Sequence, residues 1–171
     1  MIAPAFVRLM ADYNAEMNRR LYDAAGRLPE AERIRDRGAF WGSIQGTLSH
    51  LLWGDRIWMA RFAGWPKPAQ AMRESPAMAP DFAALRAARI EADAGIIAWA
   101  ATVDPGWLAG EMRWFSGAAQ REVAASHALL VTHFFNHQTH HRGQAHAMLT
   151  AAGERTGDTD LFLVVPPPWP S

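Results

Sequence analysis

The sequence contains no cysteine among its 171 residues. This absence excludes disulfides, zinc sites built from thiolates, iron–sulfur clusters and a cysteine nucleophile. Seven histidines are then the strongest nitrogen ligands available, and five of them lie between His133 and His146. Any metal chemistry in this protein is expected to use that cluster.

An excess of charge of either sign is also absent, since 17 Lys and Arg residues balance 17 Asp and Glu residues. Nucleic-acid-binding domains usually carry a basic excess, and anionic membranes attract polybasic segments. We therefore expect no nucleic-acid partner and no membrane partner. A small molecule is the expected substrate.

The sequence has no segment typical of a secretion signal or of a membrane span. Residues 1–14 have neither a basic start nor a long apolar run. The longest uncharged stretch, residues 123–141, contains several histidines, Asn136 and Gln138, which a lipid-facing helix would not carry. We expect a soluble, cytoplasmic protein with one domain over residues 1–171.

Apolar residues recur at intervals of three and four, which predicts a chain made mainly of helices. Four long helices are expected, over about residues 5–28, 38–63, 82–103 and 124–152. Asp81 is the expected N-cap of the third helix. A long Pro- and Gly-rich loop separates the second and third helices, and residues 110–123 favour a hairpin or extended connection. The predicted fold class is all-α, a four-helix bundle.

The aromatic residues fall into two groups by their spacing. One group has the helical spacing of core positions and consists of Phe40, Trp58, Phe62 and Trp99. The other group lies off this stripe and is expected at a pocket rim or a dimer face: Trp41, Trp53 and Trp65. The proline-rich tail after Val165 cannot continue a helix and is expected to cross the surface.

Histidines in the fourth predicted helix are spaced four residues apart, at 133, 137 and 141. Side chains at this spacing share a face, with Cβ atoms about 6 Å apart, so two imidazoles can reach one metal ion. A helical wheel of about 100° per residue points His137 and His141 toward the core and leaves His133 and His140 at its edge. A shared cation would offset the cost of burying two imidazoles, although a surface or hydrogen-bonded pair is the alternative.

A metal ion would need a further ligand, and His50 is the only histidine on the first three predicted helices. It shares a face with Gly46 and Gly54, which either leave room for a pocket or form a packing seam. Asp55 falls inside the apolar stripe of the same helix. It is interpreted either as a buried acceptor that orients a ligand or as a solvated residue at the bundle end.

Two segments carry a family resemblance: LSHLLWGDRIW at residues 48–58 and FFNHQTHHRGQ at residues 134–144. The chain resembles the DinB/YfiT-like family of proposed metalloenzymes over nearly its whole length. The resemblance implies a four-helix bundle, commonly a homodimer, that holds one divalent metal ion. It assigns the three metal ligands to His50, His137 and His141, and His140 is not expected to bind metal.

Three neutral imidazoles would leave coordination positions open, which is typical of catalytic sites. Zinc or nickel fits such ligands best, with iron or manganese as alternatives. The family includes S-transferases and a maleylpyruvate isomerase that use a low-molecular-weight thiol, so the resemblance implies thiol-dependent transfer or isomerisation. The alternatives are a metal-dependent hydrolase and a non-catalytic, dimeric stress-response or ligand-binding bundle.

The candidate catalytic residues are Asp55 and Gln144, and Asn136 and Arg142 are further candidates. The wheel directs Gln144 toward the site but Arg142 away from it, which favours a structural or interfacial role for the arginine. An enzyme should have a pocket open to solvent above the metal, lined by converging polar groups. In a structural metal site, protein would block the remaining position.

Overall fold

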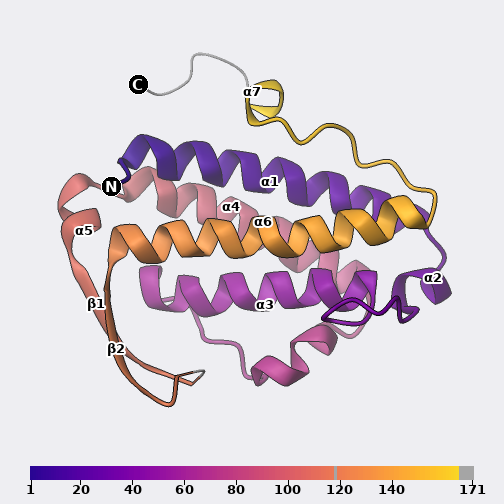
Figure 1. Ribbon diagram of the computed structural model, residues 1–171, viewed down its shortest axis with the longest axis horizontal. Coiled ribbons are helices and arrows are strands. Elements are labelled where there is room, and N and C mark those ends of the chain that lie inside the picture. The colour runs from indigo at the N-terminus through magenta and orange to yellow at the C-terminus, as the bar shows by residue number, and fades with distance from the viewer. Residues whose placement is uncertain (118, 166–171) are drawn as a thin grey trace.

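The computed structural model describes residues 1–117 and 119–165, which are mainly helical (Figure 1). The four long helices are α1 (Pro4–Arg27), α3 (Ile44–Ala63), α4 (Phe82–Thr102) and α6 (His127–Ala151). The shorter elements are α2 (Glu30–Ile34), the 3-10 helix η1 (Met72–Ala77), α5 (Pro105–Ala109), β1 (Glu111–Ser116), β2 (Arg121–Ser126) and α7 (Leu161–Val164). The predicted mainly-α class is confirmed. Of the described helices, none combines the length and apolar character needed to cross a membrane.

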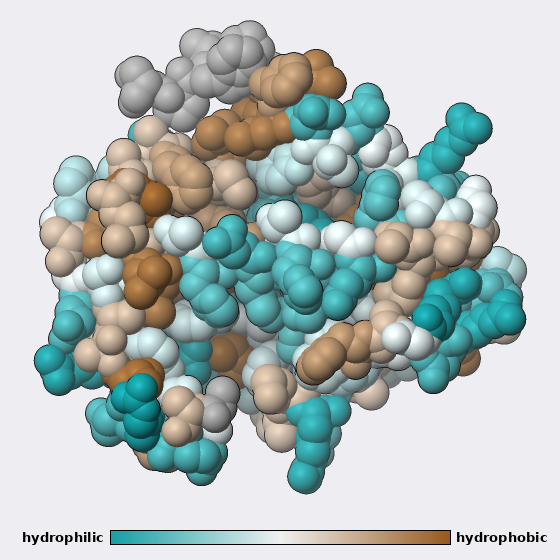
Figure 2. Space-filling view, viewed as in Figure 1, coloured by the Kyte–Doolittle hydropathy of each residue, from teal (hydrophilic) through white to brown (hydrophobic). Residues whose placement is uncertain are grey.

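The long helices pack around a shared core, because α1 and α3 each contact both α4 and α6 (Figure 1). Buried side chains form two apolar clusters in this core. One cluster includes Leu21, Leu48, Leu52 and Leu149, and the other includes Val7, Met59, Ile96 and Phe134. Hydrophilic side chains gather over the middle of the outer face along which α6 runs (Figure 2). The apolar side chains of the long helices thus form the core, as their spacing predicts.

Local signals at the helix ends explain where the long helices begin and stop. The side chain of Asp81 accepts a hydrogen bond from the Ala84 amide, so the predicted N-cap of α4 is confirmed. Ser43 caps α3 in the same way. The helix stops at Gly64, whose φ of 68° is left-handed and therefore suits a residue without a Cβ.

The second long helix begins at Ile44, six residues later than the sequence predicts. Gly38 and Gly42 both have positive φ values, and an isolated bridge pairs Ala39 with Gly42. This turn replaces the expected first helical residues. The core assignment of Phe40 is therefore wrong, since Phe40 lies in the turn and is 76% exposed. Apolar spacing alone did not reveal that the two glycines take left-handed conformations.

The expected extended connection before the last long helix is an antiparallel hairpin of β1 and β2, paired from Glu111–Ser126 to Ser116–Arg121. Strand β2 continues to Ser126, so α6 begins at 127 rather than at the predicted 124. The Ser126 side chain then caps the helix by accepting a hydrogen bond from the Leu129 amide. The predicted surface course of the tail concerns residues 166–171, which lie outside the described residues.

A buried charged cluster interrupts the apolar core. Arg89 of α4 is 2% exposed and forms ion pairs with Asp55 of α3 and with Asp93, whose Oδ1 is 2.8 Å away. Asn18 of α1 donates a hydrogen bond of 2.9 Å to Asp93. Burial opposes the charge on Arg89, but the two carboxylates outweigh it and hold the pKa of Arg89 above its ordinary value. The Arg89 guanidinium therefore links α4 to α3 through Asp55 and to α1 through Asp93 and the Asn18 amide.

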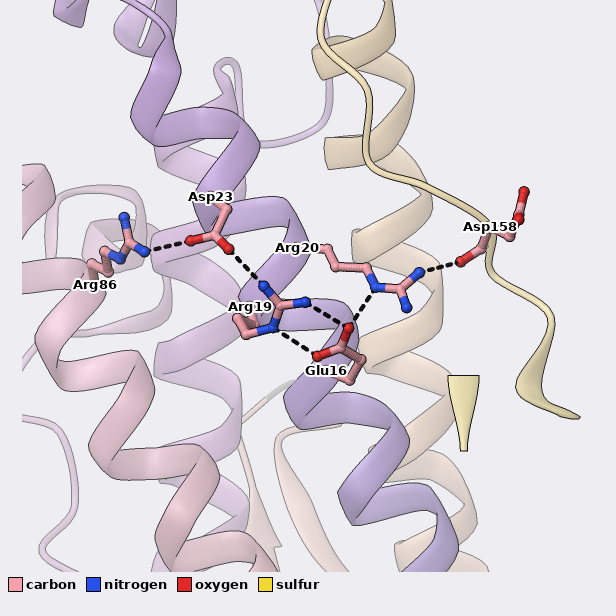
Figure 3. Close-up of polar contacts among 6 residues, drawn as sticks. All are labelled: Glu16, Arg19, Arg20, Asp23, Arg86 and Asp158. Atoms are coloured by element: carbon pink, nitrogen blue, oxygen red, sulfur yellow. Dashed lines mark hydrogen bonds and ion pairs between the residues drawn. The ribbon is translucent and has the colours of Figure 1, made fainter. Parts of the chain in front are cut away.

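Replacing Arg89 with methionine should lower the free energy of unfolding by about 3–5 kcal/mol, because two buried carboxylates lose their cation. Urea denaturation of purified protein measures this change. Arg86→Met is the matched control on the same helix, since Arg86 is 44% exposed and pairs with Asp23 at the surface (Figure 3). The control should cost less than about 1 kcal/mol. Equal losses in the two variants would contradict the interpretation.

Candidate metal centre

Three histidines from two helices converge between α3 and α6. His50 lies on α3, and His137 and His141 lie one turn apart on α6. One ligand nitrogen from each histidine lies within 4.8 Å of the other two. The Nε2 atoms of His50 and His137 are 3.4 Å apart. Two nitrogens bound tetrahedrally at about 2.0–2.1 Å from zinc would be about 3.3–3.4 Å apart, so this pair fits a shared ion.

Hydrogen bonds hold two of the imidazoles by their Nδ1 atoms. His141 Nδ1 is 2.8 Å from the amide oxygen of Gln144, which only accepts, so Nδ1 carries the proton. His50 Nδ1 is 2.8 Å from the hydroxyl oxygen of Ser75, which can accept a hydrogen bond from Nδ1–H in the same manner. With Nδ1 donating, the Nε2 lone pair of each ring is free for a metal ion.

Burial keeps the three imidazoles neutral. Burial, followed by the neighbouring imidazoles of His141 and His137, lowers the pKa of His50 to about 3. Burial and adjacent histidines lower the pKa of His137 to about 4. Burial also lowers the pKa of His141, although its hydrogen bond with Gln144 opposes this shift. A metal ion would therefore meet little competition from protons at neutral pH.

Two indoles restrict the orientation of His50. The Trp41 ring stacks on the imidazole with centroids 3.8 Å apart, and the Trp53 ring lies 5.8 Å away at a similar angle. Trp53 is itself held by a hydrogen bond of 2.9 Å from its Nε1 to the Gln70 carbonyl. Trp41 and Trp53 thus border the histidines, whereas Trp65 packs against Gly95 of α4.

Gly54 provides the space for His137. A Cβ at this position would lie 3.0 Å from Cε1 of His137, which is closer than nine in ten real Cβ contacts. A larger residue here would displace the imidazole. The sequence leaves two interpretations of the small residues beside His50, a pocket or a packing seam. At Gly54 the second interpretation holds, since the His137 imidazole packs into the space that the missing side chain leaves.

His133 and His140 are both exposed and stay outside the cluster. His133 packs edge-on against Trp58, at a centroid distance of 5.2 Å. Asn136 is also exposed. Gln144, which the wheel directs toward the site, contacts His141 as described above. Of the four candidate helper residues, Gln144 is the one that hydrogen-bonds to a histidine of the cluster.

Asp55 and Arg142 have their contacts elsewhere in the core. Asp55 is 1% exposed and pairs with Arg89, so the interpretation as a solvated residue at the bundle end is wrong. Its described hydrogen bond is to that arginine and not to a histidine. Arg142 is 6% exposed and donates a hydrogen bond to Asn14 of α1, which fits the structural role.

Ser75 is the contributor to the site that sequence reasoning missed, whereas Trp41 and Trp53 lie beside it as the pocket-rim expectation implies. Ser75 is fully buried in η1, 25 residues after His50, within a loop rich in proline. Its carbonyl also accepts a hydrogen bond of 2.6 Å from Ser49, which ties η1 to α3. No periodic pattern marks Ser75, because a loop residue reaches the site only through the folded path of the chain.

A model of the DinB family matches residues 1–165. The chain therefore belongs to the DinB family, and its buried three-histidine cluster fits a metal-binding site. The search of curated proteins and the search of solved structures gave no match.

Zinc affinity should fall by less than about tenfold between pH 7.0 and pH 5.5. Three ordinary imidazoles with a pKa of about 6.5 would together lose about 600-fold over that range, since the neutral fraction of each falls about eightfold. The lowered pKa values in the cluster remove most of this competition. Competition with a chelator of known affinity at both pH values measures the change. A loss of about 600-fold would contradict the assignment of buried, neutral ligands.

Gln144→Leu should weaken zinc binding by about 10- to 100-fold, because His141 loses the acceptor that holds its Nδ1 proton. Gln144→Glu is the matched variant, since its carboxylate keeps an acceptor and should preserve affinity within about threefold. The same chelator competition applies to both variants. Equal affinities for the leucine variant and the parent protein would show that the hydrogen bond does not orient the ligand.

Proposed function

We propose that this protein is a metalloenzyme with the four-helix bundle of the DinB type, and that His50, His137 and His141 bind one zinc or nickel ion. The observation that supports the proposal most strongly is the convergence of three neutral imidazoles from two helices. Three protein ligands leave at least one coordination position for water or substrate. A bound divalent cation would supply Lewis acidity and would favour the ionised form of a thiol or water.

We further propose that the reaction transfers or isomerises a substrate with the help of a low-molecular-weight thiol. The chain has no cysteine, so the sulfur nucleophile must come from outside. His137 and Gln144 are only half-buried, so part of each side chain is open to solvent beside the cluster. The Gln144 amide nitrogen lies 3.4 Å from His140 Nε2, and its second N–H can orient a polar substrate group beside the cluster.

The main alternative is a non-catalytic metal site in a ligand-binding or stress-response bundle. One observation favours it: two cavities, of about 460 and 570 Å³, are lined by residues other than the three histidines. Trp41 and Trp53 also occupy space beside His50. Metal binding alone would stabilise such a bundle. Metal content and catalytic activity therefore need separate measurements.

Untagged protein, reconstituted with zinc or nickel and passed through metal-free buffer, should retain about one ion per chain. His50→Ala, His137→Ala and His141→Ala should each lose the ion, because two imidazoles form a much weaker site. His133→Ala and His140→Ala are the controls and should keep it. Inductively coupled plasma mass spectrometry measures the metal. Full retention in the first three variants, or no metal in the parent protein, would overturn the site.

The activity test uses the loaded protein with glutathione and 1-chloro-2,4-dinitrobenzene as probes. The thiol sulfur forms a bond to the ring carbon, chloride leaves, and the thiol proton passes to solvent. We expect a rate above the uncatalysed one that disappears in His141→Ala. If metal binds but neither this transfer nor ester hydrolysis is accelerated, the non-catalytic alternative is favoured. Acceleration of hydrolysis alone would indicate the hydrolase.

A further inference from the structure

A cavity of about 460 Å³ lies between α1, α6 and the segment that follows α6. This segment turns back at the end of α6 and runs along α1 toward α7 (Figure 1). The polar residues that matter most in its lining are Tyr13, Arg20, Thr139, Arg142, His146 and Thr156. The α6 residues in this set lie on the opposite side of the helix from the metal centre. The volume is within the range of about 300–1,000 Å³ that is usual for small-molecule sites.

Arg142 is a buried cation that lines this cavity. It donates one hydrogen bond to Asn14 and one, of 3.3 Å, to the Thr139 hydroxyl, and its guanidinium lies 5.6 Å from the Tyr13 ring. A guanidinium has five N–H donors, so these bonds leave donors unused. Within residues 1–117 and 119–165, no carboxylate forms an ion pair with Arg142.

Arg142 lacks the carboxylate partners that the other buried arginine, Arg89, has. Arg89 has two carboxylate partners, Asp55 and Asp93, whereas both hydrogen-bond partners of Arg142 are neutral. Among the described residues, no carboxylate therefore lies within ion-pair distance of Arg142 as a counter-charge. An anion placed in the cavity would supply that counter-charge.

The segment over the cavity is fastened by its backbone carbonyls. Tyr13 donates a hydrogen bond of 2.6 Å to the Thr159 carbonyl, and Arg20 donates one of 2.9 Å to the Asp158 carbonyl (Figure 3). The Asp158 carboxylate points away from Arg20 in that view. Asp158 and Asp160 are both exposed. The acidic side chains of this segment are therefore solvated and do not neutralise Arg142.

Two apolar side chains line the α1 side of the cavity, and the exposed residues Asp158, Thr159 and Asp160 line its outer edge. Met17 and Leu21 of α1 are 6% and 4% exposed, and both belong to its wall. Gly143 also lines it, and a Cβ at that position would meet nothing within 4 Å. The cavity thus combines a planar donor group with an apolar wall and free space. A ligand with one carboxylate and an apolar body would match both features.

We propose that this cavity is a second binding site, which takes a small organic carboxylate with its carboxyl group on Arg142 and its apolar body against Met17 and Leu21. Binding here uses no metal ion and does not depend on the activity proposed above. Arg142 directly follows the metal ligand His141 but faces α1, so α6 would carry two different sites on two faces.

The probe is 4-phenylbutyrate, compared with 4-phenylbutyramide, which has the same shape without the charge. The titration uses metal-free protein, so that no carboxylate can bind at a metal ion, and follows backbone amide shifts by two-dimensional NMR. We expect saturable shifts centred on residues 139–146 and 156–160, with the amide at least about tenfold weaker. Equal binding of the two probes, or no saturable shifts below about 10 mM carboxylate, would overturn the proposal.

Gly143→Leu is the blocking variant, since its side chain would enter the open space while the Arg142 partners stay unchanged. Leucine is also a better helix former than glycine, so the fold should not be weakened. Binding of 4-phenylbutyrate should fall by at least about tenfold. Ala147→Leu adds the same side chain at an exposed position of α6 outside the cavity and should bind like the parent protein. Unchanged binding in Gly143→Leu would place the carboxylate elsewhere and refute the site.

Discussion

Charge burial is the constraint on which the arrangement of the helices depends. A buried guanidinium is tolerated only with partners, and Arg89 has them on two elements besides its own: Asp55 on α3 and, through Asp93, Asn18 on α1. Sliding α3 against α4 by one turn would separate Arg89 from Asp55 and leave both charges unpaired. The cluster therefore favours one alignment of these helices over others that would bury a similar apolar area.

That alignment also determines the metal centre. His50 lies five residues before Asp55 on α3. The position of α3 along its axis that brings Asp55 to Arg89 therefore also fixes where His50 lies along the bundle. The imidazoles of α6 meet His50 at that height, with Gly54 leaving room for His137. Both clusters avoid an unpaired buried charge, but they do so in different ways. The charged cluster pairs its ions, whereas the histidines lose their protons and keep lone pairs for a cation.

Two adjacent residues of α6 have opposite electrostatic character and face different helices. His141 faces α3 and carries a neutral, electron-donating nitrogen, whereas Arg142 faces α1 and carries a buried positive charge. A metal cation suits the first surroundings and an anion suits the second. The hydrogen bond from Arg142 to Asn14 ties α6 to α1, so this arginine also helps to hold the helix that carries two of the histidines.

Much of this arrangement was predictable from the order of residues alone. Helical periodicity predicted the four long helices, and four-residue spacing placed His137 and His141 on one face, because both depend only on the turn of a helix. Periodicity failed where the backbone leaves the helix, at Gly38 and Gly42, and Phe40 was assigned wrongly as a result.

His50 could be assigned to the cluster only through the family resemblance, since no local pattern connects residues 87 positions apart. The sequence by itself determined which residues could bind a metal, through the lack of cysteine and the spacing of histidines. Only the tertiary structure decided which side chains meet. It paired Asp55 with Arg89, brought Ser75 to His50 and left Arg142 beside a cavity, because such contacts depend on how helices and loops from distant parts of the chain pack together.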